Sequence, residues 1–285
     1  MTVEKDKEVT FGGTNGNLQL RGTNTEGTAA DNYNYSHIKF TYADVHVACT
    51  GDIRTLLDYR NYKTVDTKDA RFCNLFDGCV ALTSVPDLPA TTLASNCYYG
   101  MFYGCTNLDT APALPAKTLA DYCYYYMFRG CTNLKTAPEL PATTLASGSY
   151  SYMFRGCTNL KTVSDLPAET LKDYCYCGMF FGCINLEVAP KLPAKTLADY
   201  CYYYMFSGCT YLTSVTMLAP SEQISSNCCY GWLDDNAGTS ATARTLKVKD
   251  EAAYNALVDK SYLPNNWKKD AEGTTVLGEN SNKIE

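Results

Sequence analysis

Apolar side chains recur along the chain in blocks that share one internal spacing. In one block, Cys123, Tyr124, Met127 and Phe128 are separated by one, three and one positions, which places all four on one side of an α-helix. An Asp or Ser precedes each block like a helix N-cap, and a glycine follows nine residues later, where helices commonly end. The pattern predicts a helix of about two turns in every block. These N-cap positions are Ser95, Asp121, Ser147, Asp173 and Asp199, and the glycines are Gly104, Gly130, Gly156, Gly182 and Gly208.

A second, extended segment follows each of these glycines. It has the form Leu-x-x-Ala or Leu-x-x-Val, and proline usually comes directly after it, as at Pro112 and Pro138. Because proline has no N–H to donate to a neighbouring strand, we expect short parallel strands of about three or four residues. The segments cover residues 82–85, 108–111, 134–137, 160–163 and 186–189.

The blocks are copies of one unit. The dipeptide Gly-Cys recurs every 26 residues, five full copies run from Cys79 to Gly208, and a sixth copy with one inserted residue decays after Cys209. A tandem unit of this length is typical of a solenoid, in which each unit packs on the next and none can bury its apolar face alone. The sequence therefore predicts an array, although its length alone would suggest about two domains.

The N-terminal flank lacks the repeat. Residues 18–20, 38–42 and 45–48 alternate in polarity and predict β-strands. Residues 52–59 are expected to form the first helix. The flank as a whole is predicted to be a β-rich cap on the array.

The C-terminal flank also lacks the repeat. Residues 244–249 alternate like a last strand, Asp250 can cap a helix over residues 251–259, and Trp267 can seal the final copy. The tail after Lys268 is polar, and we expect it to be loose. The predicted domains are an N-terminal cap with the first helix (1–70), the solenoid (71–235) and a C-terminal cap with a polar tail (236–285).

The unit CxNLxxAPxLPAxTLAxxCYxxMFxG resembles the leucine-rich repeats of BspA-like bacterial surface proteins, which are abundant in gut Bacteroides. The match covers about residues 75–235, and Asn-Leu, Leu-Pro-Ala, Thr-Leu and Met-Phe recur together in five tandem copies. The resemblance implies an α/β fold, namely a right-handed leucine-rich-repeat solenoid capped at both ends. It also implies a cell-surface or secreted location and a role in binding instead of catalysis. Departures such as Ser164 and Thr216, in place of the first proline, are scattered and concern local detail.

Composition narrows the possible partners. The chain has 24 Lys and Arg against 30 Asp and Glu, with no basic run longer than two residues, so we expect no nucleic-acid partner. No stretch approaches the roughly 18 to 20 apolar residues of a membrane span, and the first residues lack the apolar stretch of a signal peptide. We expect a soluble chain. A precursor whose leader had been removed would look the same, so the sequence does not determine the cellular compartment.

Eleven of the 15 cysteines repeat along the array, and we expect them to fill packing positions as reduced thiols. Close pairs occur only at Cys175 with Cys177 and at Cys228 with Cys229, without a nearby histidine, so no metal site or cofactor is expected. The sequence does not decide whether the cysteines outside the two columns form disulfides. The first column, the Gly-Cys column, is Cys79, Cys105, Cys131, Cys157, Cys183 and Cys209; the second is Cys97, Cys123, Cys175, Cys201 and Cys228; outside them are Cys49, Cys73, Cys177 and Cys229.

No set of side chains suggests catalysis. Nucleophilic catalysis by Ser or Cys needs a base within hydrogen-bond reach, and the only two histidines, His37 and His46, lie in the N-terminal flank. The segment 234–238 resembles a calcium loop but lacks its third acidic position and its distant glutamate, so a plain turn is expected. We therefore expect that the protein is not an enzyme.

Two groups of repeated positions are candidates for binding. The first comprises tyrosines next to the apolar stripe, which either stack on one another, the interpretation that we favour, or contact a carbohydrate or protein surface. The second comprises charged positions on and just after the predicted strands, which either form a solvated face or contact a partner. The tyrosines are Tyr99, Tyr125 and Tyr203 in one row and Tyr126, Tyr152 and Tyr204 in another; the charges are Asp109, Lys135, Lys161 and Glu187, followed by Glu139, Asp165 and Lys191.

The function that the sequence favours is non-enzymatic adhesion at a bacterial surface. An extended solenoid face would bind a host or bacterial surface protein, because the charged positions vary between copies while the apolar positions do not. Lys135 and Lys161, flanked by Asp109 and Glu187, would suit an acidic patch on that partner. The alternative is a glycan-binding module that uses the tyrosine rows, and a structural surface-layer component is a third possibility.

Overall fold

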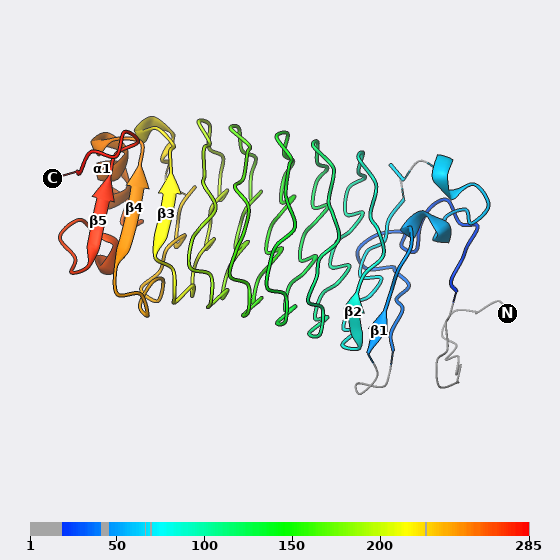
Figure 1. Cartoon of the computed structure of the whole chain (residues 1–285). Coiled ribbons are helices and arrows are strands. Elements are labelled where there is room, and N and C mark those ends of the chain that lie inside the picture. The colour runs from blue at the N-terminus through cyan, green and yellow to red at the C-terminus, as the bar shows by residue number, and fades with distance from the viewer. Residues whose placement is uncertain (1–18, 41–45, 66, 69, 226, 285) are drawn as a thin grey trace.

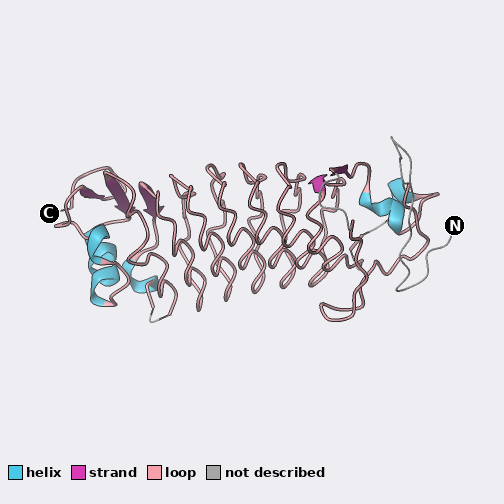
Figure 2. Cartoon of the chain, turned by 90° about the horizontal axis from the view of Figure 1, so that it is seen from below, coloured by secondary structure: helices cyan, strands magenta, loops and turns pink. Residues whose placement is uncertain are grey.

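The structure, a computed structural model, describes residues 19–40, 46–65, 67–68, 70–225 and 227–284. The chain forms an elongated array of loops stacked side by side, with the N- and C-terminal segments at opposite ends (Figure 1). We call one copy of the repeat in this stack a rung. Helices and strands gather at the two ends, whereas the middle of the array consists of turns and extended segments (Figure 2).

Each rung carries a ribbon of consecutive β-turns where the apolar stripe predicted a helix. The N–H of Tyr99 donates to the carbonyl of Asn96, three residues back, at 3.1 Å. The N–H of the preceding residue, Tyr98, donates instead to the carbonyl of Cys123 in the next rung, at 3.0 Å. This alternation continues along the ribbon, so half of its N–H groups close turns and the other half join neighbouring rungs.

The ribbon requires a left-handed backbone at every fourth residue. In one rung these residues are Asn96, Gly100 and Gly104, with φ of 59°, 56° and 67°. Repeated positive φ interrupts the i to i−4 hydrogen bonds of an α-helix, so the helix prediction is wrong for the rungs. The predicted N-cap Asp121 instead accepts the N–H of Ser147 in the next rung, at 3.0 Å.

β-Structure is sparse along the array. Strand β1 (Val47–Ala48) pairs in parallel with β2 (Leu82–Ser84), and the middle rungs have only isolated parallel bridges such as that of Thr136 with Thr162. Pro138, two residues after Thr136, has no N–H with which to extend that bridge. The predicted short strands therefore form next to the ends of the array and shrink to single bridges between them.

The C-terminal end holds the most regular part of the fold. Strands β3 (Ser214–Met217), β4 (Arg244–Val248) and β5 (Thr274–Leu277) form a parallel sheet in the order β3-β4-β5. Helix α1 (Glu251–Asp259) follows β4, and the side chain of Asp250 accepts the N–H of its third residue. The predicted strand and the predicted capped helix of this flank are thus confirmed.

The segment after Lys268 was expected to be loose, and that prediction is wrong. It forms β5, which pairs with β4, and then turns back so that the N–H of Ile284 donates to the carbonyl of Val276 at 3.0 Å. Both side chains are buried. Trp267 is also fully buried, and its indole N–H donates to the carbonyl of Ala237 at 2.9 Å.

The N-terminal segment is less regular than predicted. Residues 53–56 form a 3₁₀ helix in place of the expected first helix, and Asp52 caps it by accepting the N–H of Arg54. Of the three expected strands, only Val47–Ala48 forms among the described residues; residues 19–20 and 38–40 are not in strands, and residues 18 and 41–45 lie outside the described residues. The other 3₁₀ helices are Tyr62–Thr64, Ser221–Gln223 and Asn265–Trp267.

Columns of identical side chains fill the interior. The rings of Tyr98 and Tyr124 stack with centroids 5.9 Å apart, and those of Phe102 and Phe128 stack 5.6 Å apart. Equivalent pairs continue through the later rungs, and the inner tyrosines, methionines and phenylalanines are all buried, as the apolar stripe predicted. Each rung therefore buries its apolar side chains against the rung before and the rung after it.

The cysteines are unpaired. All 15 thiols are free, and all but Cys49 are buried. In the Gly-Cys column, each thiol after the first also donates to a phenylalanine carbonyl of an earlier rung, as Cys105 does to Phe76 at 3.2 Å. The column therefore fills space as expected, and in addition it satisfies backbone carbonyls, which the sequence did not reveal.

We expect the Gly-Cys thiols to resist alkylation by iodoacetamide in the native protein at about pH 8. Burial raises the pKa of Cys157 to about 12, and the thiolate is the reactive form, so this side chain stays protonated below that pH. In denaturant without reductant, intact-mass measurement should count 15 labels, the six of the column among them. Half-buried Cys49, outside the columns, serves as the control that reacts first. Three disulfides within the column would contradict the expectation.

Candidate functional site

The first candidate surface is a row of charged residues beside the parallel bridges, which we call the strand-side face. It is formed by Asp109, Lys135, Lys161 and Glu187, one from each of four successive rungs, and all four side chains are exposed. The N–H of Lys161 donates to the carbonyl of Lys135 at 3.0 Å, so these two rungs are in register at the row. The predicted charge row is therefore brought together on one surface.

The charges of this row are not neutralised by one another. Among the described residues, ion pairs join Arg54 to Asp52 and Lys195 to Glu169, and neither involves the row. Lys135 and Lys161 thus place two ammonium groups on neighbouring rungs, which are about 4.8 Å apart in a parallel arrangement. Like charges on neighbouring rungs repel each other, so an anionic group that approaches both would be attracted.

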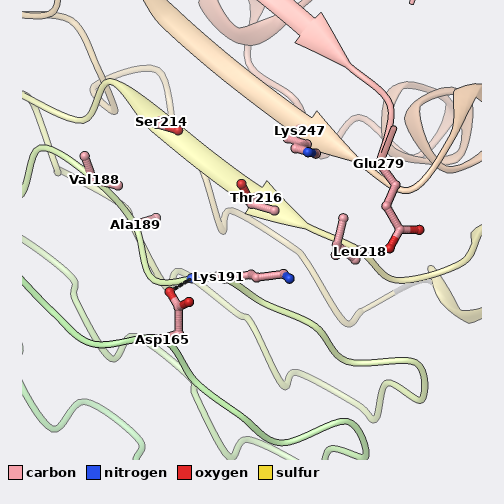
Figure 3. A pocket seen from close by; sticks show the side chains of 9 residues that line it. All are labelled: Asp165, Val188, Ala189, Lys191, Ser214, Thr216, Leu218, Lys247 and Glu279. Atoms are coloured by element: carbon pink, nitrogen blue, oxygen red, sulfur yellow. Dashed lines mark hydrogen bonds between the residues drawn. The ribbon is translucent and has the colours of Figure 1, made fainter. Parts of the chain in front are cut away.

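A hollow of about 440 Å³ lies at the C-terminal end of the same face (Figure 3). Figure 3 shows Asp165 and Lys191 on one side of β3, and Lys247 with Glu279 on the other. The backbone N–H of Lys191 donates to the Asp165 carboxylate at 2.9 Å, and the Lys247 ammonium donates to a serine hydroxyl beyond the hollow at 3.2 Å. The remaining lining residues are Val188, Ala189, Ser214, Thr216 and Leu218.

The hollow arises where the backbone of the repeats gives way to the regular sheet. Val188 pairs with Ser214 and Leu192 pairs with Met217, so five residues of the last repeat lie opposite four residues of β3. The repeat must bulge to accommodate the extra residue, whereas β3, which has Thr216 at the usual proline position, continues straight. The step between them leaves the hollow.

The second candidate surface is formed by the outer tyrosines, and most of their rings contact one another. Tyr99 stacks on Tyr125 with centroids 5.0 Å apart, and Tyr126 lies 5.4 Å from Tyr152. All six predicted tyrosines are only partly exposed. Much of the surface of these rings is therefore covered by neighbouring rings of the same protein.

The tyrosine rows are interrupted in the middle of the array. Ser151 and Cys177 stand between Tyr125 and Tyr203 in the first row, so the rings form two separate clusters. In addition, the guanidinium of Arg129 lies 4.7 Å from the ring centroid of Tyr126, in the N-terminal cluster. A continuous aromatic platform along the array is therefore absent from the described residues.

The titratable groups of this surface do not suggest catalysis. Burial raises the pKa of Tyr125, and its hydrogen bond with Tyr126 raises it further, so this hydroxyl stays protonated at neutral pH. Burial likewise raises the pKa of Tyr152. His37 and His46 are exposed at the N-terminal end.

Comparison with known protein families shows to which repeat family the chain belongs. The model of the BspA type leucine-rich repeat region matches six copies, over residues 73–179 and 139–234. Together these matches cover more than half of the chain. The chain belongs to the BspA-type leucine-rich-repeat family. The resemblance noted in the sequence is thus confirmed, and a search of curated proteins found no match.

BspA-type repeats are associated with surface proteins and with modules of the protein-interaction or adhesion type, and the family is typically non-catalytic. No helix among the described residues is long and apolar enough to cross a membrane. Within the same part of the chain, no three His, Cys, Asp or Glu side chains gather so as to hold a metal ion. Asp234, in the calcium-like segment, instead accepts the N–H groups of Gly208 and Ala237 at 3.0 Å, as a turn residue does.

Sequence reasoning missed part of the hollow in this BspA-type array. Lys247 was expected in a strand without a role, and Glu279 lay in the segment expected to be loose. One signal was available, because Thr216 replaces the first proline of the unit and marks where the bulge ends. The charge row itself could be predicted from the 26-residue period of the repeat alone.

Proposed function

We propose that this BspA-type protein is a non-enzymatic binding or adhesion protein at a cell surface or in secreted form. Its strand-side face would bind a host or bacterial surface protein that presents an acidic patch. The observation that carries the proposal is the pair Lys135 and Lys161, exposed on neighbouring rungs and without an ion-pair partner among the described residues. The family association with adhesion-type modules supports the same conclusion.

The size of the face suits a protein partner. Six or seven rungs at about 4.8 Å each span roughly 30 Å, which accommodates a standard interface of about 800 Å² per partner. The C-terminal hollow extends the face with two more lysines, Lys191 and Lys247. Val188, 56 % exposed at its edge, offers an apolar contact, which a surface of charges alone would lack.

The face is held between two segments that we propose as caps, residues 1–70 and 236–285. At the first end, the N–H groups of Thr28 and Ile38 donate to carbonyls of the first rung, at 2.8 and 2.6 Å. At the other end, residues 283–284 turn back along β5 and cover part of its free edge. The right-handed winding implied by the family stays a prediction.

Reversing the two lysine charges should weaken binding mainly through slower association. We expect Lys135→Glu with Lys161→Glu to lower the association rate about tenfold at low salt and less at high salt, because electrostatic steering is screened by ions. Surface plasmon resonance against purified extracellular-matrix proteins and mucin measures both rates. The matched control is Lys172→Glu with Lys260→Glu, which changes net charge equally at exposed positions outside the face.

The outcome separates the two candidate surfaces. If the charge reversal leaves binding untouched while Tyr125→Ala with Tyr126→Ala abolishes it, the tyrosine side is the site and the strand-side proposal fails. If the control pair slows association as much as the test pair, net charge accounts for the effect, and the proposal fails as well.

A further inference from the structure

We infer that the N-terminal tyrosine cluster holds a binding site for one neutral sugar ring, separate from the strand-side face. The site is a hollow of about 190 Å³ at the first rungs of the array. Its lining residues are Asn74, Asp77, Tyr99, Gly100, Tyr103 and Tyr126. Three of them, Asn74, Asp77 and Tyr103, lie outside the tyrosine rows and the charge row.

The hollow exists because a glycine interrupts one tyrosine row. Gly100 occupies the position that Tyr126 and Tyr152 occupy in the next two rungs, and its φ is 56°. A side chain there would collide with the amide oxygen of Asn74. The volume is well below the roughly 300–1,000 Å³ of drug-sized pockets, so it has room for a single ring or a group of similar size.

Aromatic rings line the hollow in two directions. The ring of Tyr126 meets that of Tyr99 at 76° and that of Tyr103 at 74°, with centroids 6.0 and 6.4 Å apart. A sugar ring has an apolar C–H face and a rim of hydroxyl groups. An aromatic ring can cover the apolar face, while the perpendicular ring and the polar lining residues reach the rim.

Two polar groups of the hollow make no hydrogen bond within the described residues. Asn74 is only 9 % exposed, yet its side-chain amide makes no hydrogen bond there, and neither does the carboxylate of Asp77. Neither side chain is fully enclosed, so the amide and the carboxylate remain accessible to a ligand in the hollow. An amide that both donates and accepts, next to a carboxylate that accepts, matches the hydroxyl groups of a sugar.

The charges around the hollow favour a neutral ligand over a cation. Burial raises the pKa of Asp77, but the ammonium of Lys39 opposes the rise, so a positive group already lies near this carboxylate. The guanidinium of Arg129 already occupies a cation–π position 4.7 Å from the ring centroid of Tyr126. A second cation would be repelled by these groups, whereas a neutral polyhydroxyl ligand would not.

A later rung shows the same framework with the hollow filled. Gly178 stands where Gly100 does, but the ring of Tyr152 lies directly over it, where the first rung has the smaller side chain of Asn74. Phe181 and Arg155 replace the tyrosine and aspartate of the wall, with the guanidinium 4.6 Å from the ring centroid. The ring of Tyr152 therefore takes up the space in this later rung that is open at the N-terminal cluster.

The test uses the full chain and the methyl glycosides of glucose, galactose, mannose and N-acetylglucosamine. We expect saturation-transfer NMR to detect at least one of them, and titration to show about tenfold weaker binding for Asp77→Asn and for Tyr126→Ala. Tyr204→Ala is the matched control, because it removes a partly exposed ring at the same position of a rung that has no open hollow. Its affinity should equal that of the unchanged protein.

Three results would overturn the inference. The first is no saturation transfer from any of the four glycosides at about 10 mM, a concentration that would reveal even millimolar affinity. The second is an equal loss in Tyr204→Ala, which would assign binding to the whole row. The third is stronger binding of a trimethyl-lysine peptide than of any sugar. If Tyr126→Ala does not fold, the affinity of the near-isosteric Asp77→Asn variant decides whether the hollow binds the sugar. Neither variant changes the strand-side face, so the result does not bear on that proposal.

Discussion

Deletion of residues 1–70 is expected to abolish soluble expression of the remaining chain. The deletion uncovers the first rung, whose Phe72, Leu75 and Phe76 are each no more than 2 % exposed in the intact protein. A terminal rung of a solenoid cannot bury its apolar face without a cap, and a large exposed apolar patch promotes association. Soluble yield and size-exclusion chromatography measure the effect.

The matched control removes a rung from the middle. Deleting residues 131–156 takes out one whole unit and leaves both end segments in place, so the shortened chain should stay soluble. A chain lacking residues 1–70 that is monomeric and melts like the full protein would contradict the cap proposal. Residues 1–70 would then form an independent domain.

Truncation of a central ring should cause the largest loss among single substitutions. We expect Phe154→Ala to lower the free energy of unfolding by about 3–5 kcal/mol, because it opens a cavity in a fully buried column. The ring stacks on Phe128 and on Phe180, with centroids 5.6 and 5.7 Å away, so two rung interfaces lose contacts. Chemical denaturation followed by circular dichroism measures the loss.

The first ring of the same column provides the comparison. Phe76 is also buried, but within the described residues its ring stacks on that of Phe102 alone, at 5.7 Å. An aromatic pair contributes about 0.5–1.5 kcal/mol beyond its buried area, so Phe76→Ala should cost less than Phe154→Ala by about this amount. Equal losses at the two positions would show that contacts between neighbouring rungs do not add along the column.

The failed helix prediction has a specific cause. Apolar residues separated by one, three and four positions face one side of an α-helix, but they also face one side of a ribbon of β-turns. The distinguishing signal lay in the residues between them, where Asn96 and Gly148 share one position of the unit and Gly100 and Gly178 share another. Asn and Gly tolerate a positive φ, and the structure has one at all four. Other copies place tyrosine at these positions, which hid the signal.

The candidate sites differ in how far the sequence could predict them. The charge row followed from the repeat alone, because equal spacing in the chain places Lys135 beside Lys161. The C-terminal hollow depends on a one-residue change of register and joins Lys191 to Glu279, which no periodicity relates. The N-terminal hollow depends on the rung before the first complete copy, where Asn74 stands at the position of a tyrosine.

The two hollows lie near opposite ends of an array whose middle rungs contact only their immediate neighbours. Insertion or loss of one unit would therefore leave the lining of both hollows unchanged and alter only the distance between them, in steps of about 4.8 Å. The number of middle rungs therefore sets the distance between the two hollows. A lineage could match the separation of two ligand groups on another surface by changing the number of units, without remodelling either end.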